Sequence, residues 1–297
     1  MRVFLTGATG FIGSHVIPEL QERGHHVIGL TRSDEGARRL EAAGVEACRG
    51  DLEDPASLSR GATLADAVIH CAFDHDFARF VENTQKDARN IAAMGDALEG
   101  TGRPILITSG VGIGTPRHGG PATEDVLNPH HANPRIATEL AAAGLTARRI
   151  DVRTIRLPQV HDTHKAGLIT PLIGEARRAG AVAYIGEGGS RWAAAHVGDV
   201  ARLYALALER GEPGARYHAS AEEGIAMKAI AEAIGAGAGL PVRSIATEEA
   251  ERYFGWMAGF ATLDMTASSS WTRARLGWEP VGPDLLSDLA AMDFAHA

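Results

Sequence analysis

The chain has 297 residues, an apolar fraction of 45% and a formal net charge of −8 at neutral pH. This length suffices for one large or two modest domains with a buried core. The acidic balance argues against nucleic acid as a partner, and no run approaches the roughly 18 apolar residues of a membrane span. Because Cys48 and Cys71 are too few for a disulfide framework and the first residues resemble no signal peptide, we expect a cytoplasmic protein with reduced thiols.

The first predicted strand, residues 2–6, leads into a glycine-rich turn and a helix predicted over 11–23. Glycines at 7, 10 and 13 give the pattern G-x-x-G-x-x-G, which lets the chain turn tightly and approach a phosphate closely. The helix start adds free N–H groups and partial positive charge. This turn predicts a dinucleotide site, and Pro18 is expected to kink the helix. The site residues expected here are Gly7, Thr9, Gly10, Phe11, Ile12 and Gly13.

Short β-rich runs then alternate with helical stretches. Further strands are predicted near 26–32, 45–49, 66–72, 104–109 and 152–157, with helices near 34–43, 77–99 and 134–148. This alternation predicts an α/β fold, a Rossmann-type doubly wound parallel sheet. We assign residues 1–157 to a dinucleotide-binding domain. Residues 158–297, with helices near 168–179 and from 196, are expected to form a smaller substrate-binding lobe at the carboxyl edge, of which 193–222 packs back on the first domain.

The end of the second strand bears on the choice of cofactor. A carboxylate at this position would bind the ribose hydroxyls of NAD, but the chain has Arg32 and Ser33, which suit the 2′-phosphate of NADP. Arg38 is a candidate second cation. Asp34 follows directly, so NAD stays as the alternative, and a surface arginine without ligand is the simplest other interpretation.

Several motifs extend this pattern over almost the whole chain. They are G-D-L at 50–52, V-I-H-C-A at 68–72, L-I-T-S-G at 106–110, I-R-L-P-Q-V-H at 155–161, A-H-V-G-D-V-A at 195–201 and R-L-G-W-E-P at 275–280. Together with the glycine turn they resemble the extended short-chain dehydrogenase/reductase family, which includes NAD-dependent epimerases and dehydratases. The resemblance implies further cofactor contacts at Asp51, Leu52, Cys71, Ala72, Phe73, Thr108, Arg135, Leu157, Pro158 and Val160. It also implies a homodimer paired through the helices at 77–99 and 134–148.

The family's catalytic Tyr-x-x-x-Lys pair is absent. The residues four positions after the tyrosines at 184, 204, 217 and 253 are Gly188, Leu208, Ala221 and Met257. Family members often carry a glutamate four residues after the lysine, and anchoring on Glu139 puts Arg135 at the lysine position and His131 at the tyrosine position. The position of the family's serine on the fifth strand corresponds to Ser109 or Gly110 in this chain. Histidine titrates near neutral pH and arginine stabilises negative charge, so His131 and Arg135 form a coherent catalytic pair with Ser109. A polar loop before a helix is the alternative.

Other side chains are candidate substrate contacts. His75 and Asp76 follow the fourth strand at the edge where such folds bind ligands, so either could face the nicotinamide and supply an alternative acid, although helix capping also explains the aspartate. His161 and His164 are of metal-binding type, but two histidines give too few ligands, so we expect no metal and assign both to the substrate cleft. Further expected cleft residues are Arg191, Trp192, Tyr184, His196 and Trp256, with the hydrophobic core as the alternative for the aromatic ones.

The sequence therefore predicts an NADP(H)-dependent oxidoreductase that reduces a small carbonyl or C=N compound by hydride transfer. In this hypothesis Arg135 positions the cofactor, Ser109 or Thr108 orients the substrate, and His131 donates the proton. An iminium substrate already carries its proton, so the missing tyrosine matters less for it. Two alternatives remain: an inactive dinucleotide-binding sensor, and an epimerase or isomerase that retains its cofactor. The expected partner is a small-molecule substrate, without nucleic acid or membrane.

Overall fold

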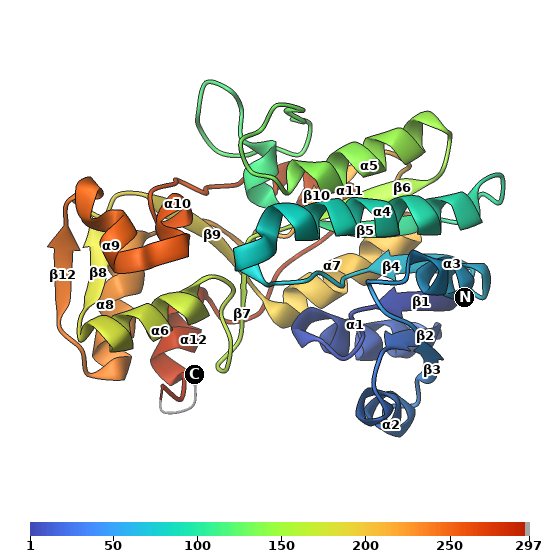
Figure 1. Cartoon of the computed structure of the whole chain (residues 1–297), viewed down its shortest axis with the longest axis horizontal. Coiled ribbons are helices and arrows are strands. Elements are labelled where there is room, and N and C mark those ends of the chain that lie inside the picture. The colour runs from blue at the N-terminus through green and yellow to red at the C-terminus, as the bar shows by residue number, and fades with distance from the viewer. Residues whose placement is uncertain (295–297) are drawn as a thin grey trace.

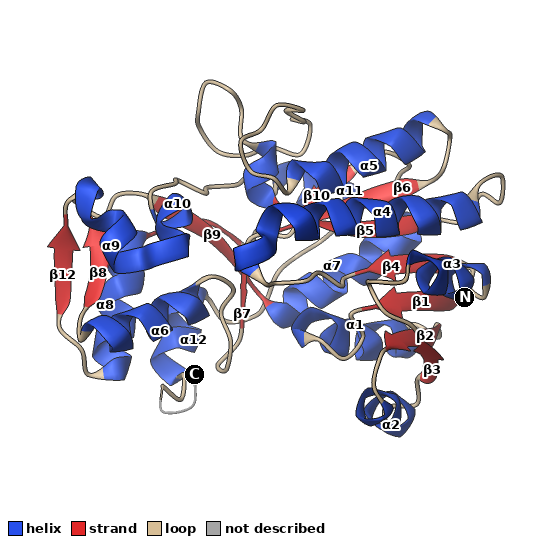
Figure 2. Ribbon diagram, in the orientation of Figure 1, coloured by secondary structure: helices blue, strands red, loops and turns tan. Residues whose placement is uncertain are grey.

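A seven-stranded parallel sheet forms the larger of two lobes in the computed structural model, which describes residues 1–294 (Figures 1 and 2). The strand order is β10-β6-β5-β4-β1-β2-β3. The strands are β1 Arg2–Thr6, β2 His26–Thr31, β3 Glu46–Arg49, β4 Ala67–His70, β5 Ile105–Gly110, β6 Val152–Leu157 and β10 Arg216–His218. The order reverses between β1 and β4, which is the topological switch point where doubly wound sheets bind ligands. The predicted fold class is confirmed.

Helices cover both faces of this sheet, and its strands bury side chains on both sides. In β1, Val3 and Leu5 belong to the core under α1 and α7, whereas Phe4 points into the core under α3, α4 and α5. This follows from the two-residue period of a strand. The helices are α1 Phe11–Glu22, α2 Asp34–Ala42, α3 Pro55–Thr63, α4 Phe80–Leu98, α5 Ile136–Ala147 and α7 Val197–Arg210. Helix α1 continues through Pro18, which is exposed, and α3 is an element that the sequence prediction lacked.

The smaller lobe contains two short sheets, where the sequence indicated only a loop and a helix up to about residue 192. One sheet has the order β11-β9-β7 and the other pairs β12 with β8. These strands are β7 Gln159–His161, β8 Val182–Ile185, β9 Arg191–His196, β11 Glu222–Ala226 and β12 Val242–Ile245. They are short, and the centre of β9 is three alanines, so the local sequence carries little strand signal. These strands are defined only by hydrogen bonding to strands from distant parts of the sequence.

Helices α6 Ile169–Ala179, α8 Met227–Ala238, α9 Ala250–Phe254, α10 Ala258–Ala261 and α12 Leu285–Ala291 complete the smaller lobe. Its apolar core is separate from those of the large sheet. The chain passes between the lobes several times: α7 packs on α1 and β10 joins the sheet edge beside β6. Near the C-terminus, α11 Ser270–Leu276 and Trp278 pack against the core of the large lobe. The lobes are therefore interleaved along the chain.

Because β6 continues through Pro158 into β7 of the smaller lobe, the carboxyl edge of the parallel sheet faces that lobe (Figure 1). Residues that follow β1, β4 and β5 are thereby brought to one edge. Within residues 1–294, no helix combines the length and apolar character needed to cross a bilayer.

Two helical glycines test how tightly α3 packs on the sheet. A Cβ at Gly61 of α3 would lie 2.2 Å from Cζ of Phe4, whereas a Cβ at Gly144 of α5 meets nothing within 4 Å. We expect Gly61→Ala to lower the free energy of unfolding by about 1–3 kcal/mol through overpacking. The matched change Gly144→Ala should raise it by about 0.5–1 kcal/mol through helix propensity. Urea unfolding followed by circular dichroism measures both; equal effects would contradict this packing.

Candidate dinucleotide and substrate site

At the glycine-rich turn between β1 and α1, backbone segments approach one another too closely to leave room for a Cβ atom. Gly7 has φ +69°, and a Cβ there would lie 2.9 Å from the backbone nitrogen of Ala72 after β4. A Cβ at Gly13 would lie only 2.1 Å from the carbonyl oxygen of Gly7. Gly10 donates its N–H to Gly7 O at 2.9 Å and is itself exposed. The turn therefore joins the ends of β1 and β4 and presents Gly10 outward.

The start of α1 suits an anion. Gly10 is its N-cap residue and supplies no side chain, and the first turn of the helix contains no acidic residue. The N–H groups of Phe11 and Ile12 have no intrahelical acceptor at this position, and a negative ligand is the partner that a helix start favours. Thr9, Phe11 and Ile12 are half-buried beside it. These features fit the diphosphate of a dinucleotide.

The charged side chains at the end of β2 differ in exposure and in whether they form an ion pair. Arg32 is exposed, while Ser33 caps α2 by accepting the N–H of Gly36 at 3.0 Å. Asp34, the carboxylate that could bind ribose hydroxyls, is paired with Arg49 from the end of β3. Arg38 is also exposed. This carboxylate is therefore neutralised by a neighbour, and the guanidinium of Arg32 faces solvent.

The turn after β3 is ordered by local hydrogen bonds. Asp51 Oδ1 accepts the N–H of Glu53 at 3.0 Å, and the Asp51 N–H bonds the Ser57 hydroxyl at 3.1 Å. The carbonyl of Leu52 accepts the Asn90 side chain from α4. These contacts fix Asp51 and Leu52 at the same carboxyl edge as the glycine turn.

A buried polar cluster lies behind the ends of β4 and β5. Thr108 Oγ1 donates to the carbonyl of His70 at 2.7 Å and lies 2.6 Å from the hydroxyl of Tyr204 in α7. Burial raises the pKa of the Cys71 thiol to about 11, so this thiol is neutral. Cys48 and Cys71 are both free thiols. The hydroxyl of Thr108 is thus already engaged inside the protein.

Arg135 provides a fixed positive charge at this edge. Its guanidinium carbon lies 3.6 Å from the centre of the Phe73 ring, and its Nη2 donates to the carbonyl of Thr108 at 2.9 Å. Within residues 1–294 no carboxylate lies close enough to form an ion pair with it. Burial lowers the pKa of the guanidinium, although arginine stays charged at any ordinary pH. The remaining N–H donors of Arg135 are available to a ligand.

The other two expected catalytic residues are more constrained. Ser109 is 3% exposed and donates its hydroxyl to Glu139 Oε1 at 2.7 Å, so it faces the protein interior. His131 Nδ1 accepts the N–H of Asn133 at 3.0 Å, and the ring also bonds the backbone of Gly112. Partial burial lowers the pKa of His131. The structure thus gives Ser109 a structural contact and ties the His131 ring to the backbone.

The carboxylate of Glu139 organises a buried ion network beside the site. It accepts Nε and Nη2 of Arg156, each at 2.7 Å, and Arg216 lies 3.3 Å away. Arg156 Nη1 also donates to Nε2 of His218 at 3.2 Å. Burial, and then the charge of Arg156, lower the pKa of His218 to about 3. Removal of one partner from such a network leaves an uncompensated buried charge.

His75 and Lys165 are further basic side chains near Arg135. The His75 ring lies 5.2 Å from the Phe73 ring, edge to face. Burial, and then the charges of Arg135 and Lys165, lower the pKa of His75. Lys165 Nζ lies 5.6 Å from the centre of the Phe11 ring at the glycine turn. Sequence reasoning missed Lys165, although it is one of only three lysines in the chain.

Two of the expected substrate contacts, Trp192 and His161, have fully buried side chains. Trp192 lies in the core of the smaller lobe and donates its indole N–H to the carbonyl of Leu263 at 3.3 Å. His161 is paired with Asp288 at 2.7 Å. By contrast, His164 is exposed, and Arg191 is exposed and paired with Asp264.

Other expected site residues are half-buried or buried near the end of β6. Leu157 and Pro158 are half-buried where β6 leaves the sheet, and Val160 is buried in β7. No group of three or more metal-ligating side chains occurs in the part of the chain that the structure describes.

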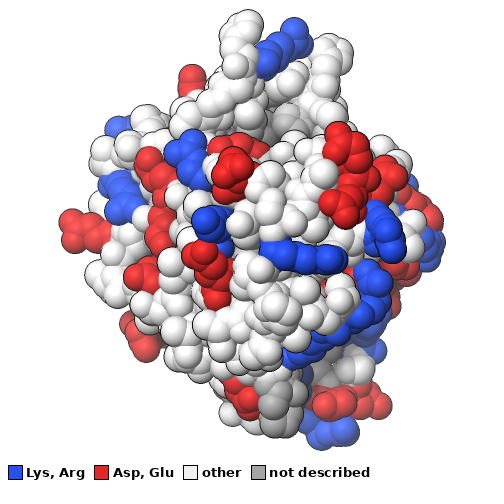
Figure 3. Space-filling model, turned by 90° about the vertical axis from the view of Figure 1, so that its left-hand side faces the viewer, with Lys and Arg blue, Asp and Glu red and all other residues white. Residues whose placement is uncertain are grey.

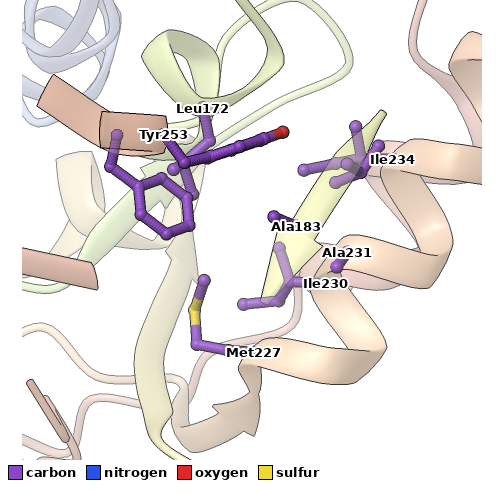
Figure 4. Close-up of a pocket in the computed structure, with 9 residues that line it drawn as sticks. Leu172, Ala183, Met227, Ile230, Ala231, Ile234 and Tyr253 are labelled. Carbon is purple, nitrogen blue, oxygen red and sulfur yellow. The ribbon is translucent and has the colours of Figure 1, made fainter. Parts of the chain in front are cut away.

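Two hollows lie in the smaller lobe, away from the glycine turn. An apolar cavity of about 10 Å³ lies among side chains of α6, β8, α8 and α9, including Met227 and Tyr253 (Figure 4). It is about the size of one water molecule, so it is a packing defect rather than a ligand site. A hollow of about 240 Å³ lies at the outer end of the lobe and is lined by Arg178, Arg243 and Arg252. Basic and acidic side chains are interspersed over this end of the molecule (Figure 3).

This glycine turn and parallel sheet define a dinucleotide-binding enzyme fold, and the chain belongs to the NAD dependent epimerase/dehydratase family, whose model matches residues 3–220. It is 42% identical to the Schizosaccharomyces pombe "Uncharacterized protein C2A9.02" over 98% of this chain and 99% of that one. It is 27% identical to a 2-alkyl-3-oxoalkanoate reductase of Stenotrophomonas maltophilia, over 81% of this chain and 77% of that one.

The fold is also that of a solved UDP-glucose 4-epimerase from Thermus thermophilus in complex with NAD. The TM-score is 0.75 at 23% identity, over 100% of this chain and 98% of that one. The family and these likenesses support a nicotinamide dinucleotide cofactor and an enzyme of the oxidoreductase or epimerase type.

The pKa of His218 gives a prediction for stability. An unfolded histidine titrates near 6.5, so between about pH 3 and 6.5 the unfolded chain binds more protons at His218 than the folded protein does. Stability contributed by neutral His218 is therefore lost as the pH falls through this window, by up to about 1.4 kcal/mol per unit. We expect His218→Asn, which cannot titrate, to unfold with a shallower pH dependence between pH 6.5 and 4. Parallel slopes for the two proteins in urea unfolding would contradict this assignment.

Proposed function

We propose that this protein is an NADP(H)-dependent reductase of a small carbonyl or C=N compound. The observation that carries this proposal is the location of the Arg135 guanidinium, stacked on Phe73 without a carboxylate partner among the described residues, at the same sheet edge as the open start of α1. The open start of α1 suits the diphosphate of a dinucleotide, and the Arg135 guanidinium suits a substrate whose oxygen gains negative charge during reduction.

The arrangement at the end of β2 supports NADP over NAD. NAD recognition requires a carboxylate for the ribose hydroxyls, but Asp34 is occupied by Arg49. The exposed Arg32 has the geometry and charge to bind a 2′-phosphate, and Ser33 can add its hydroxyl beside it. Arg38 is a further exposed cation one helical turn along.

In this proposal a bound NADPH supplies a hydride, and the residues of this chain orient the substrate and provide the proton. Arg135 donates hydrogen bonds to the substrate oxygen and stabilises its negative charge. Thr108 acts through its carbonyl, which positions Arg135, rather than through its hydroxyl. We assign the proton to His75 because its ring lies 5.2 Å from that of Phe73, the ring on which the Arg135 guanidinium stacks. Both His75 and His131 also bond the backbone, at Phe73 and Gly112 respectively, so the position beside Arg135 decides between them.

A C=N substrate needs less help from such a donor. A protonated imine already carries the proton that a carbonyl must acquire. It is itself a cation, however, and the fixed charge of Arg135 repels it, so this site favours a carbonyl over a protonated imine. A panel of aldehydes, ketones and cyclic imines, each mixed with NADPH and followed by nicotinamide absorbance, tests the proposal. Tight NADPH binding without turnover of any member would favour the dinucleotide sensor. Interconversion of stereoisomers without net oxidation of NADPH would favour the epimerase.

Arg32→Ala tests the cofactor preference. Loss of a charge-assisted hydrogen bond to the 2′-phosphate is worth about 1.5–3 kcal/mol, which corresponds to a KM for NADPH raised about 10- to 100-fold. The KM for NADH should change little, because NADH lacks this phosphate. Arg117→Ala removes a comparable side chain from a distant loop and should change neither value. Equal losses with both cofactors would refute a role for Arg32 in discriminating them.

The pKa of His75 predicts the pH dependence of the reaction. Burial and two neighbouring cations hold this pKa below 6.5, so the protonated form is scarce at neutral pH. If His75 is the acid, kcat/KM for reduction rises as the pH falls toward that pKa, by about tenfold per unit. His75→Gln should flatten this profile and lower kcat by about 10²-fold.

His131→Asn is the matched variant for this test, since it also replaces a partly buried histidine near the same edge. It should retain the pH dependence of the wild-type protein. If instead His131→Asn flattens the profile and His75→Gln does not, the proton donor is His131.

A further inference from the structure

Five aromatic side chains gather between the two lobes; we call them the aromatic cluster. Phe73 and Phe77 come from the segment between β4 and α4, and Phe80 is the first residue of α4. Trp256 and Phe260 come from the smaller lobe. The Phe77 and Trp256 rings are stacked, with centres 4.2 Å apart and planes at 16°. Phe260 lies edge-on to Phe77 and Phe80 at 6.3 and 6.4 Å. The cluster therefore joins the lobes through ring contacts.

This cluster begins at the proposed reaction centre. The guanidinium of Arg135 stacks on Phe73, and the Phe73 ring is 6.1 Å from Phe80 and 5.2 Å from His75. Ring contacts then continue through Phe77 to Trp256. One end of the surface is thus cationic and hydrogen-bonding, and the other end is apolar and aromatic.

The cluster is not a closed core. Trp256 is 45% exposed, whereas Trp192 and Trp278 are fully buried. Val81 and Leu263, close in sequence to the two halves of the cluster, are 61% and 46% exposed. Trp256 adjoins Phe77 and Phe260, and adjoining apolar side chains that stay accessible on a soluble protein commonly mark a binding surface. An indole stacked on one face and open elsewhere favours a second planar ring, because aromatic pairs gain energy beyond area burial.

Resting on the reductase function proposed above, we propose that the substrate is an aryl carbonyl compound, whose ring packs on the aromatic cluster at Trp256 while its carbonyl oxygen faces Arg135 and His75. The distribution of polar groups disfavours a sugar here. Sugar hydroxyls lose hydrogen bonds to water on burial and need protein partners, and the rings of Phe77, Phe80 and Phe260 offer none.

Paired substrates that differ only in the ring test this inference. Benzaldehyde and cyclohexanecarbaldehyde have the same carbon count and the same carbonyl, but only the first is planar. With NADPH, wild-type kcat/KM should favour benzaldehyde by about three- to tenfold, the size of one aromatic stack. Trp256→Leu should remove this preference by lowering the value for benzaldehyde more than that for cyclohexanecarbaldehyde. A preference that persists in Trp256→Leu, or none in the wild-type protein, would overturn the inference.

Trp271→Leu is the matched control. Trp271 is also exposed, at 43%, and also stacked on one ring, that of Tyr217, but it lies in α11 against the far edge strand β10. This variant should keep the preference for benzaldehyde. If both tryptophan variants lose the preference for benzaldehyde equally, the loss reflects a general change in stability, and the assignment of the ring site to Trp256 is wrong.

A binding measurement separates failure of this inference from failure of the proposed function. Benzamide and cyclohexanecarboxamide carry the same unreactive carbonyl and can be titrated by ligand-observed NMR into the full chain with NADPH present. Tighter binding of benzamide to the wild-type protein, lost in Trp256→Leu, supports the aryl site even if no aldehyde is reduced. Equal binding of the two amides refutes it, whether or not the protein is a reductase.

Discussion

The close approach of three backbone segments at the glycine turn is the constraint on which the site depends. Gly7 lies against the segment after β4, and Gly13 lies against the carbonyl of Gly7, with no space for a Cβ at either position. This contact aims the start of α1 at the carboxyl ends of the central strands. It also fixes where Ala72 and Phe73 leave β4, and hence where the guanidinium of Arg135 can stack. Cofactor geometry and catalytic geometry therefore share one packing contact.

A buried network of charged side chains lies next to the carboxyl edge of the sheet and holds its elements together. Glu139 binds Ser109, Arg156 and Arg216, so one carboxylate links α5, β5, β6 and β10. Such networks are sensitive to the loss of any member, because the remaining charges stay buried. The price of the arrangement is that Ser109 no longer offers its hydroxyl to a ligand. Ser109 is therefore part of the scaffold, and Arg135, which donates to the carbonyl of the neighbouring Thr108, carries positive charge at this edge.

Aromatic rings join the two lobes. Phe77 of the larger lobe stacks on Trp256 of the smaller one, close to the cation over Phe73. This surface is cationic at one end and aromatic at the other, and the substrate proposed for it differs from a nucleotide sugar, although the backbone fold is shared with a UDP-glucose 4-epimerase. The fold positions the cofactor, and these side chains determine what is presented to it.

The sequence by itself determined the parallel sheet, the glycine turn and the absence of the Tyr-x-x-x-Lys pair, because hydrophobic periodicity, glycine spacing and residue identity are local properties. It could not determine the strands of the smaller lobe, whose short, alanine-rich segments are defined by pairing across the chain. Nor could it decide the burial of Trp192 and His161 or the turning of Ser109 toward Glu139, which depend on neighbours far away in sequence. Lys165 came into view for the same reason, as did the stacking of Trp256 on Phe77, because only tertiary structure decides which distant side chains lie together.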